Sequence, residues 1–229
     1  MIQSNYIPWK GYFDLIRNAD LFVHYDEVQY TKNDWRNRNR IYSKNGLAWL
    51  TIPISRQAVH GPISAVELGS SDWQDLHFKT LQQAYGRARY FGQLLPLMEQ
   101  GLLAQRWRRL IDVNRFWMKA VSELIGIRTA FVDSKDYVLQ GSRVERLLGL
   151  LRTVGATEYI TGPSARDYLS ESELLFEQAG IRLTYWDYQG YPEYTQMRAP
   201  FEHYVSIVDL LANVELAEIP RHIWGWRKG

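Results

Sequence analysis

The side chains best suited to chemistry lie close together between residues 26 and 40, directly after a short apolar run. Two carboxylates, Asp26 and Glu27, open this stretch, and a carboxylate at a strand end can accept a proton from a substrate or orient an amine. Amides, guanidiniums and an indole follow, namely Gln29, Asn33, Trp35, Arg36, Asn37, Arg38, Asn39 and Arg40. A charged run is ordinarily a solvated face, but such a face needs neither an indole nor several asparagines. The pattern therefore predicts a binding site.

The three arginines of this stretch alternate with asparagines. In an extended conformation Arg36, Arg38 and Arg40 would project to one face, and the asparagines between them to the other. Guanidinium groups match phosphate oxygens bidentately, so the pattern predicts a clamp for the diphosphate of a nucleotide-linked substrate. It equally suits an RNA-binding arm over residues 32–44 in which Trp35 stacks on a base. The sequence leaves both interpretations open.

A second candidate site follows the apolar run that ends at Thr161. Gly162 lets the backbone approach a ligand, Ser164 offers a hydroxyl, and the N–H groups of the turn can hold a phosphate or a carboxylate. The stretch is neither a P-loop nor a dinucleotide-binding fingerprint, and an ordinary turn explains it equally well. We expect Gly162 and Ser164 to hold phosphates together with the arginines.

Among the five histidines, His77 is the best placed to act as a general base near neutral pH, because it lies in a predicted helix whose start could face the polar loop. His24, at the end of a predicted strand, is the next candidate. The histidines lack the spacing typical of a metal site. Neither a Ser-His-Asp order nor a nucleophile elbow is apparent, so a covalent mechanism is not indicated. Asp26, Glu27 and His77 are thus the candidate catalytic residues.

These candidates require a fold that brings their loops together. Alternating strand and helix patterns predict an α/β fold with a mostly parallel, Rossmann-like sheet, helices on both faces, and a site at the carboxyl ends of the strands. We expect one domain over residues 1–229, with a helical insertion at about residues 71–126. The expected strands are residues 1–5, 21–24, 47–54, 128–132, 158–161 and 182–188.

The expected helices are residues 9–18, 71–85, 94–99, 103–126, 142–155, 170–180 and 204–214. Three of them begin with the spacing of a capping box, in Ser71 with Gln74, Ser142 with Glu145, and Ser170 with Glu173. Residues 26–46 are expected to form a long polar loop, or a loop with an extended arm, that ends in the turn signal Asn45-Gly46.

The composition limits the class of protein. The chain has no cysteine, which excludes disulfides, thiolate nucleophiles and cysteine-bound metals. No signal peptide is visible, and no apolar run reaches the 18 residues that would cross a membrane, so we expect a cytoplasmic protein. A net charge of +2 gives no overall attraction to nucleic acid and disfavours it as a partner. Nine tryptophans and fifteen tyrosines are many, and in loops such rings often line sugar-binding sites.

Residues along nearly the whole chain resemble those of the WbqC-like family. The most specific part is the amino-terminal motif, which consists of Gln3, Asn5, Tyr6, Pro8, Trp9, Gly11, Tyr12, Asp20, Asp26, Val28, Gln29, Trp35, Asn39 and Arg40. The later matches are Trp49, Leu50, Pro53, His77, Tyr85, Tyr159, Gly162, Ser164, Tyr168, Leu169, Tyr194, Gln196, Phe201, Ser206, Asp209 and Leu210.

This resemblance implies a role in bacterial polysaccharide or O-antigen biosynthesis, where such proteins are described as glycine transferases acting on an amino sugar. It implies transfer of an aminoacyl or acyl group to the amine of a nucleotide-linked sugar, from an activated donor such as an acyl carrier or an aminoacyl ester. ATP is the one further cofactor to consider. The expected substrate-binding residues are Asn5, Tyr6, Trp9, Gln29, Trp35, Arg36, Arg38, Asn39, Arg40, Gly162 and Ser164.

A weaker likeness concerns the layout of strand, Pro8, Trp9-Lys10-Gly11-Tyr12 and helix, which is similar to that of HIGH-type nucleotidyltransferases and amide-forming ligases. In those enzymes two histidines of this element contact the ATP phosphates. Trp9 and Tyr12 stand in the place of these histidines. An ATP-dependent amide ligase or a nucleotidyltransferase-like enzyme is therefore an alternative to the transferase, and the RNA-binding arm is another.

Overall fold

Two pairs of parallel strands form the centre of the protein, of which the computed structural model describes residues 1–55, 60–70 and 72–227. Strand β1 (Leu21–His24) pairs with β4 (Ala130–Asp133), and β5 (Glu158–Thr161) pairs with β6 (Arg182–Tyr185). The predicted α/β class and the mainly parallel pairing are confirmed. The strands are hydrogen-bonded two by two, in three two-stranded sheets of which the third is antiparallel.

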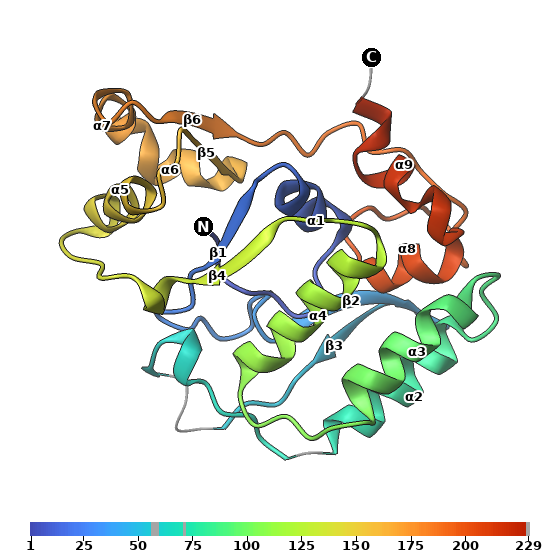
Figure 1. Ribbon diagram of the computed structural model, residues 1–229. Coiled ribbons are helices and arrows are strands. Elements are labelled where there is room, and N and C mark those ends of the chain that lie inside the picture. Colours follow the sequence, from blue (N-terminus) through green and yellow to red (C-terminus); the bar gives the residue numbers. More distant parts are fainter. Residues whose placement is uncertain (56–59, 71, 228–229) are drawn as a thin grey trace.

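The amino-terminal segment lies between the two parallel pairs (Figure 1). On one side Ile2 bridges His24 in parallel register, and the amide of Ile2 donates to the carbonyl of Val23 at 3.1 Å. On the other side the hydroxyl of Tyr159 in β5 donates to the carbonyl of Met1 at 3.2 Å. The predicted strand over residues 1–5 is thus reduced to a single bridge. From this segment the chain continues first to β1 and β4 on one side and later to β5 and β6 on the other, so the strand order reverses here.

Helices cover both sides of these strands (Figure 1). Helix α1 (Lys10–Arg17) connects the amino-terminal segment to β1, and α5 (Arg143–Thr153) precedes β5. The capping box of Ser142 and Glu145 at the start of α5 is confirmed. Two further helices, α6 (Arg166–Leu169) and α7 (Glu173–Gln178), lie between β5 and β6 in the chain.

The predicted helix over residues 170–180 is shorter than expected. The side chain of Ser170 caps nothing, because Ser170–Ser172 forms a 3-10 turn, and α7 starts only at Glu173. The predicted cap is therefore wrong at this position.

A hairpin precedes the helices of the expected insertion. Strands β2 (Arg38–Ser43) and β3 (Gly46–Thr51) pair in antiparallel register, where a long polar loop or a loop with an extended arm was expected over residues 26–46. Asn37 and Asn39 are buried and donate to backbone carbonyls, so they take the inward positions that apolar residues usually hold in a strand. The polar composition therefore concealed β2.

Three helices follow the hairpin, namely α2 (Trp73–Tyr85), α3 (Phe91–Leu102) and α4 (Leu110–Leu124). The predicted helix over residues 103–126 is wrong in its first turns, because α4 begins only at Leu110. Helix α3 is longer than the predicted residues 94–99. Ser71 of the predicted capping box lies outside the described residues, and the side chain of Gln74 bonds to the connection between α3 and α4 instead.

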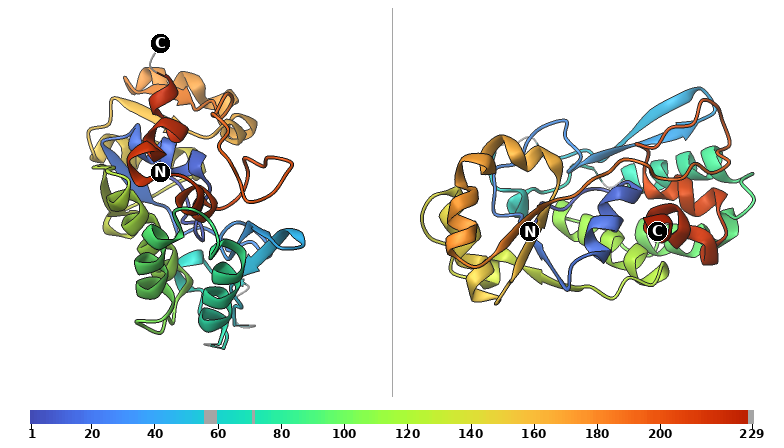
Figure 2. Two further views of the ribbon diagram at one scale, coloured as in Figure 1. Left: turned by 90° about the vertical axis from the view of Figure 1, so that its right-hand side faces the viewer. Right: turned by 90° about the horizontal axis from the view of Figure 1, so that it is seen from above.

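The buried apolar residues form two separate clusters. The larger one joins α1, β1, the β2–β3 hairpin, α2–α4 and the carboxyl-terminal helices α8 (Ile207–Asn213) and α9 (Ile219–Ile223). The smaller one joins α5, α6, α7, β5 and β6. We call the elements around the larger cluster the larger half and those around the smaller cluster the smaller half. Seen from above, α5–α7 and α8–α9 lie at opposite ends of the molecule (Figure 2). None of the described helices combines the length and the apolar character needed to cross a membrane.

Candidate functional site

An open cavity of ≈ 880 Å³ lies between the two halves, at the carboxyl ends of the amino-terminal segment, β1 and β5. In open α/β sheets this position, where the strand order reverses, is where ligands bind. The larger half contributes Gln3, Asn5, Trp9, Tyr12, Tyr25, Val28, Gln29, Trp35, Arg36 and Tyr188. The smaller half contributes Gly141, Arg143, Arg146, Leu147, Tyr159, Thr161, Gly162, Pro163, Ser164, Ala165 and Tyr168. The two stretches predicted from sequence as sites thus face the same cavity.

The charges around this cavity have one sign. Its described lining includes three guanidinium groups, of Arg36, Arg143 and Arg146, and no carboxylate or imidazole. Asp34 pairs with Arg36 at 3.6 Å, whereas no ion pair among the described residues holds Arg143 or Arg146. Unpaired positive groups in a concave surface attract anions, and guanidinium is well suited to bind phosphate. The cavity is therefore suited to an anionic ligand.

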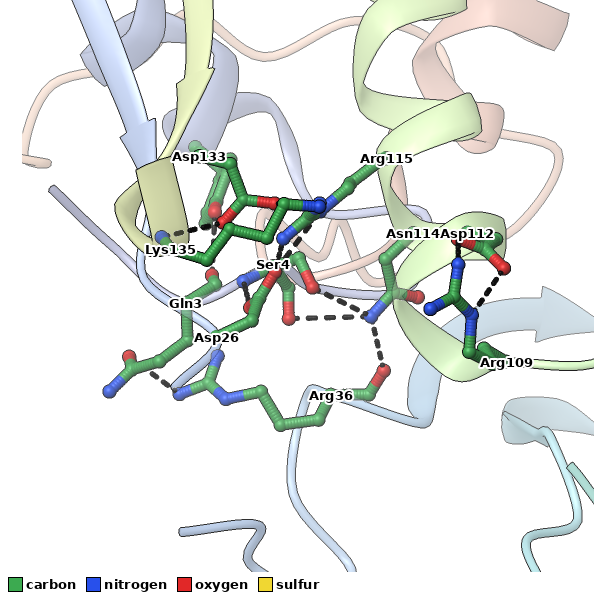
Figure 3. A network of polar contacts seen from close by, with 11 residues as sticks. Gln3, Ser4, Asp26, Arg36, Arg109, Asp112, Asn114, Arg115, Asp133 and Lys135 are labelled. Carbon is green, nitrogen blue, oxygen red and sulfur yellow. Dashed lines mark hydrogen bonds and ion pairs between the residues drawn. The ribbon is translucent and has the colours of Figure 1, made fainter. Parts of the chain in front are cut away.

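Arg36 organises two amide side chains of the amino-terminal segment. Its guanidinium donates to the Oε1 atom of Gln3 at 3.2 Å (Figure 3). It also donates to the Oδ1 atom of Asn5 and lies 3.6 Å from a carboxylate oxygen of Asp34. Because a guanidinium only donates, the amide oxygens must face it, and the amide NH₂ groups point away. The Asn5 amide nitrogen has no partner among the described residues, so it is available to a ligand.

Arg143 and Arg146 lie on the first turns of α5 and are both exposed. The guanidinium of Arg143 stacks over the ring of Tyr168, 3.5 Å from its centroid, and Nε of Arg146 donates to the carbonyl of Gly141 at 3.0 Å. Sequence reasoning missed both residues. Their spacing of three residues at the start of a capped helix, just upstream of a strand end, was the available signal.

The loop after β5 places Gly162 and Ser164 at the cavity, as expected from the sequence. It forms one 3-10 turn, Pro163–Ala165, in which the amide of Ala165 donates to the carbonyl of Gly162 at 3.1 Å. Ser164 is exposed on this turn, opposite the amino-terminal segment. Its hydroxyl can therefore reach a ligand in the cavity.

The other two arginines of the predicted clamp lie outside the cavity. Arg38 and Arg40 share one face of β2, which confirms the predicted alternation within the strand. The guanidinium of Arg38 covers the ring of Trp49 at 4.1 Å, and that of Arg40 donates to the carbonyl of Tyr204 at 3.1 Å. The predicted common face for all three guanidiniums is therefore wrong, because Arg36 precedes the strand and turns into the cavity.

Asp26 is fully buried in an ion network under the cavity (Figure 3). Its Oδ1 atom accepts the amide of Ser4 at 2.8 Å, and its Oδ2 atom accepts two N–H groups of Arg115 at 2.8 and 3.2 Å. Arg115 also donates to Asp133, the last residue of β4. The network fastens the ends of β1, β4 and the amino-terminal segment to α4, and Asp26 does not line the cavity.

Asn114, the neighbour of Arg115 on α4, holds the residues that present the cavity wall. Its buried Nδ2 atom lies 2.9 Å from the carbonyl of Arg36 and 3.3 Å from the carbonyl of Ser4 (Figure 3). One side chain thereby connects the loop before β2 to the amino-terminal segment. Asn5 and Arg36 are consequently held at fixed positions.

His77 and Tyr6 are buried and do not line the cavity. Nε2 of His77 lies 3.1 Å from the carbonyl of Thr51, which can only accept, so this nitrogen carries the proton. Nδ1 then accepts the hydroxyl of Tyr6 at 2.9 Å. Burial lowers the pKa of His77 to about 4, although the Thr51 carbonyl acts in the opposite direction. Both side chains support the wall from behind.

Of the remaining candidates, Glu27 and Gln29 are exposed, and Asn39 is buried. Glu27 is exposed, between Tyr25 and Val28 of the cavity wall. Gln29 lines the cavity. The buried Asn39 donates to the carbonyls of Tyr6 and Ile7 at 3.1 and 2.8 Å, so its amide supports the turn before α1.

Trp9 and Trp35 border both this cavity and a smaller pocket of ≈ 190 Å³. The smaller pocket is lined by Asn5, Pro8, Trp9, Trp35, Asn39 and Tyr204. A Cβ atom at Gly11 would come within 2.3 Å of the Trp9 ring, so the glycine allows this ring to pack on the start of α1. The two spaces share three lining residues and therefore adjoin each other.

Comparison with known proteins identifies relatives of the chain. The model of the WbqC-like protein family matches residues 3–220. The uncharacterized protein Rv1507c of Mycobacterium tuberculosis (strain ATCC 25618 / H37Rv) is 42% identical over 224 residues, which cover 97% of this chain and 96% of that protein. No solved structure matches the chain. The chain belongs to the WbqC-like protein family.

Proposed function

We propose that this protein is a biosynthetic transferase that attaches an aminoacyl group, such as glycyl, or an acyl group to the amine of a nucleotide-linked amino sugar in bacterial polysaccharide biosynthesis. Membership of the WbqC-like family supports a biosynthetic role. The observation that carries the proposal is the cavity whose described lining has three guanidiniums and no carboxylate. A diphosphate would neutralise the charge of Arg143 and Arg146, since Arg36 is paired with Asp34.

The phosphates would lie on the side of the smaller half. Arg143 and Arg146 are exposed there and keep most of their N–H donors free, whereas Arg36 already donates to Gln3 and Asn5. The Ser164 hydroxyl would add a further donor. This assignment leaves Arg36 to orient the amides rather than to bind phosphate directly.

The acyl transfer would take place beside Gln3 and Asn5. The sugar amine attacks the carbonyl carbon of the activated donor, the bond to the thiol or alcohol breaks, and the proton of the amine passes to a base. Amide NH₂ groups that face the reaction can stabilise the oxyanion that forms on the attacked carbonyl. Glu27 would take the proton through a bridging water, because it is exposed and follows the wall residue Tyr25 by two positions but does not itself line the cavity. Asp26 and His77 would position the wall.

Isothermal titration with UDP-linked and dTDP-linked amino sugars tests the phosphate site. We expect Arg143→Gln and Arg146→Gln each to weaken binding about tenfold, since each removes one charged donor worth about 1.4 kcal/mol. Arg152→Gln is the matched control, because Arg152 is exposed on the same helix but does not line the cavity.

Unchanged binding in both variants would contradict the proposed site. Binding of ATP, together with release of pyrophosphate that depends on an added carboxylic or amino acid, would favour the amide ligase instead. Loss of binding in the Arg152→Gln control would indicate that the effect is one of overall charge rather than of the cavity.

A further inference from the structure

The smaller pocket differs in chemistry from the cavity that it adjoins. Its six lining residues include the rings of Trp9, Trp35 and Tyr204, two asparagines and a proline, and none of them is charged. Three guanidiniums line the neighbouring cavity. A ligand that extends across both spaces would therefore have an anionic part at one end and a neutral part at the other.

The rings of the pocket form a corner rather than a slot. The centroids of Trp9 and Tyr204 are 5.0 Å apart and their planes meet at 43°, so no flat group fits between them. Tyr188 and Tyr191 pack edge-on against Trp9 at 5.1 and 5.8 Å and fix its orientation. A corner of this kind suits a puckered ring with C–H groups on its faces, whereas a planar base is better held between parallel rings.

Two of the rings are much more exposed than their size would lead one to expect. Trp35 is 40% exposed and Tyr204 is 54% exposed, although both are large aromatic side chains. Asn5 lies where the pocket meets the cavity and turns its NH₂ group away from Arg36. An amide donor beside exposed rings matches a molecule that carries hydroxyl oxygens and an apolar face, which is the chemistry of a sugar.

We propose that the pocket formed by Trp9, Trp35 and Tyr204 is a neutral subsite that holds the pyranose ring of a sugar nucleotide whose phosphates lie in the adjoining cavity. This inference rests on the proposed function. It adds the residues that select the sugar, and it places the sugar at Asn5, beside the proposed site of acyl transfer.

The ratio of two affinities tests the subsite. Titrations with UDP and UDP-glucosamine, and with dTDP and dTDP-glucose, measure how much the sugar contributes to binding. In the wild-type chain we expect the sugar nucleotide of at least one pair to bind about tenfold more tightly than its diphosphate. Tyr204→Ala and Trp35→Ala should bring this ratio close to one. Tyr204→Ala should also change the affinity for the diphosphate less than twofold, because Tyr204 does not line the phosphate cavity.

Tyr137→Ala is the matched control, since Tyr137 is a half-buried aromatic residue that lines neither the pocket nor the cavity. Tyr204→Ala keeps the backbone carbonyl that Arg40 contacts, so the local fold is retained. Intrinsic tryptophan fluorescence gives a second readout, because a sugar placed against Trp9 and Trp35 should change their emission more than the diphosphate alone does.

The outcomes separate the two proposals. A wild-type ratio near one, or a ratio that stays high in both variants, would overturn the subsite while leaving the phosphate cavity in place. An equal loss of affinity for the diphosphate and the sugar nucleotide would overturn it as well, because the nucleobase would then occupy the pocket. If the wild-type chain binds none of the four ligands, the proposed function fails, and the subsite fails with it.

Discussion

Arg36 determines the orientation of the groups around it. Its guanidinium turns the oxygens of Gln3 and Asn5 inward, so these two amides present donors to the cavity. Asn114 holds the backbone of the same arginine, and the buried pair of Arg115 and Asp26 lies below. A residue that would be assigned to phosphate binding on type alone therefore acts mainly as a positioning residue.

His77 gives a prediction about pH. Burial lowers its folded-state pKa to about 4, while an unfolded histidine titrates near 6.5, so the unfolded chain binds the extra proton first as the pH falls. The contribution of His77 to stability is complete above about pH 6.5 and is lost progressively toward pH 4, by about 1.4 kcal/mol per pH unit. His24, whose pKa burial also lowers to about 4, acts in the same direction.

Urea unfolding between pH 7 and pH 4 measures this effect. We expect His77→Gln to reduce the slope of the unfolding free energy against pH by about 1.4 kcal/mol per pH unit relative to the wild-type chain, which corresponds to one proton. His60→Gln, a change at an exposed histidine, should leave the slope as it is. An unaltered slope in His77→Gln would show that His77 takes up its proton over the same pH range in the folded and the unfolded chain, and would contradict the lowered pKa.

At the scale of elements, Gln74 fastens the connection between α3 and α4. Its Nε2 atom donates to the carbonyls of Leu102 and Gln105 at 3.2 and 2.7 Å, and its Oε1 atom accepts the amide of Trp107 at 3.1 Å. The side chain is completely buried. These bonds satisfy the backbone groups that become free where the helical pattern is interrupted.

Gln74→Leu should lower the free energy of unfolding by about 3 kcal/mol, because a side chain of similar size leaves three backbone groups without partners. Urea unfolding at pH 7 gives the value. Gln83→Leu on the exposed side of the same helix is the control and should stay within about 0.5 kcal/mol of the wild-type chain. A change of that small size in Gln74→Leu would contradict the assigned role.

The sequence predicted the elements whose local signals agree with the tertiary structure. The apolar run before Asp26, the strand that ends at Thr161 and the capping box at Ser142 are of this kind. It failed where a polar side chain replaces an apolar one: the buried Asn39 concealed β2. It also failed where apolar periodicity continues through residues 103–109, which are held out of helix by contacts distant in sequence.

The candidate site was likewise predicted in its location but not in its individual residues. The Gly162 loop and the first forty residues were expected to bind one ligand, and the structure places both at one cavity. Which individual side chains reach the cavity depends on packing that the sequence does not display. Asp26 and Tyr6 are buried beneath the cavity by their hydrogen-bond partners. Arg143 and Arg146 line the cavity from a helix that the capping box predicted but that no binding motif marked.

At the scale of the whole molecule, the cavity separates two apolar cores. The amino-terminal segment and the residues after β1 belong to the larger core, and the start of α5 with the loop after β5 belongs to the smaller. A ligand that contacts both sides connects two units that otherwise share few buried residues. Its binding should therefore stabilise the relative position of the halves as well as each wall.

Hydrogen exchange with and without a sugar nucleotide at a hundred times its dissociation constant tests this expectation. That excess should stabilise the fold by about 2.7 kcal/mol. Amide protection should rise on both sides of the cavity, in residues 1–6 and 25–36 of the larger half and in residues 141–147 and 162–168 of the smaller half. Exchange in α2, which does not line the cavity, serves as the internal reference. Protection limited to one half would contradict a ligand that spans the cavity. Protection by RNA of the hairpin that carries Arg38 and Arg40 would favour the nucleic-acid arm, because these half-buried guanidiniums lie outside the cavity.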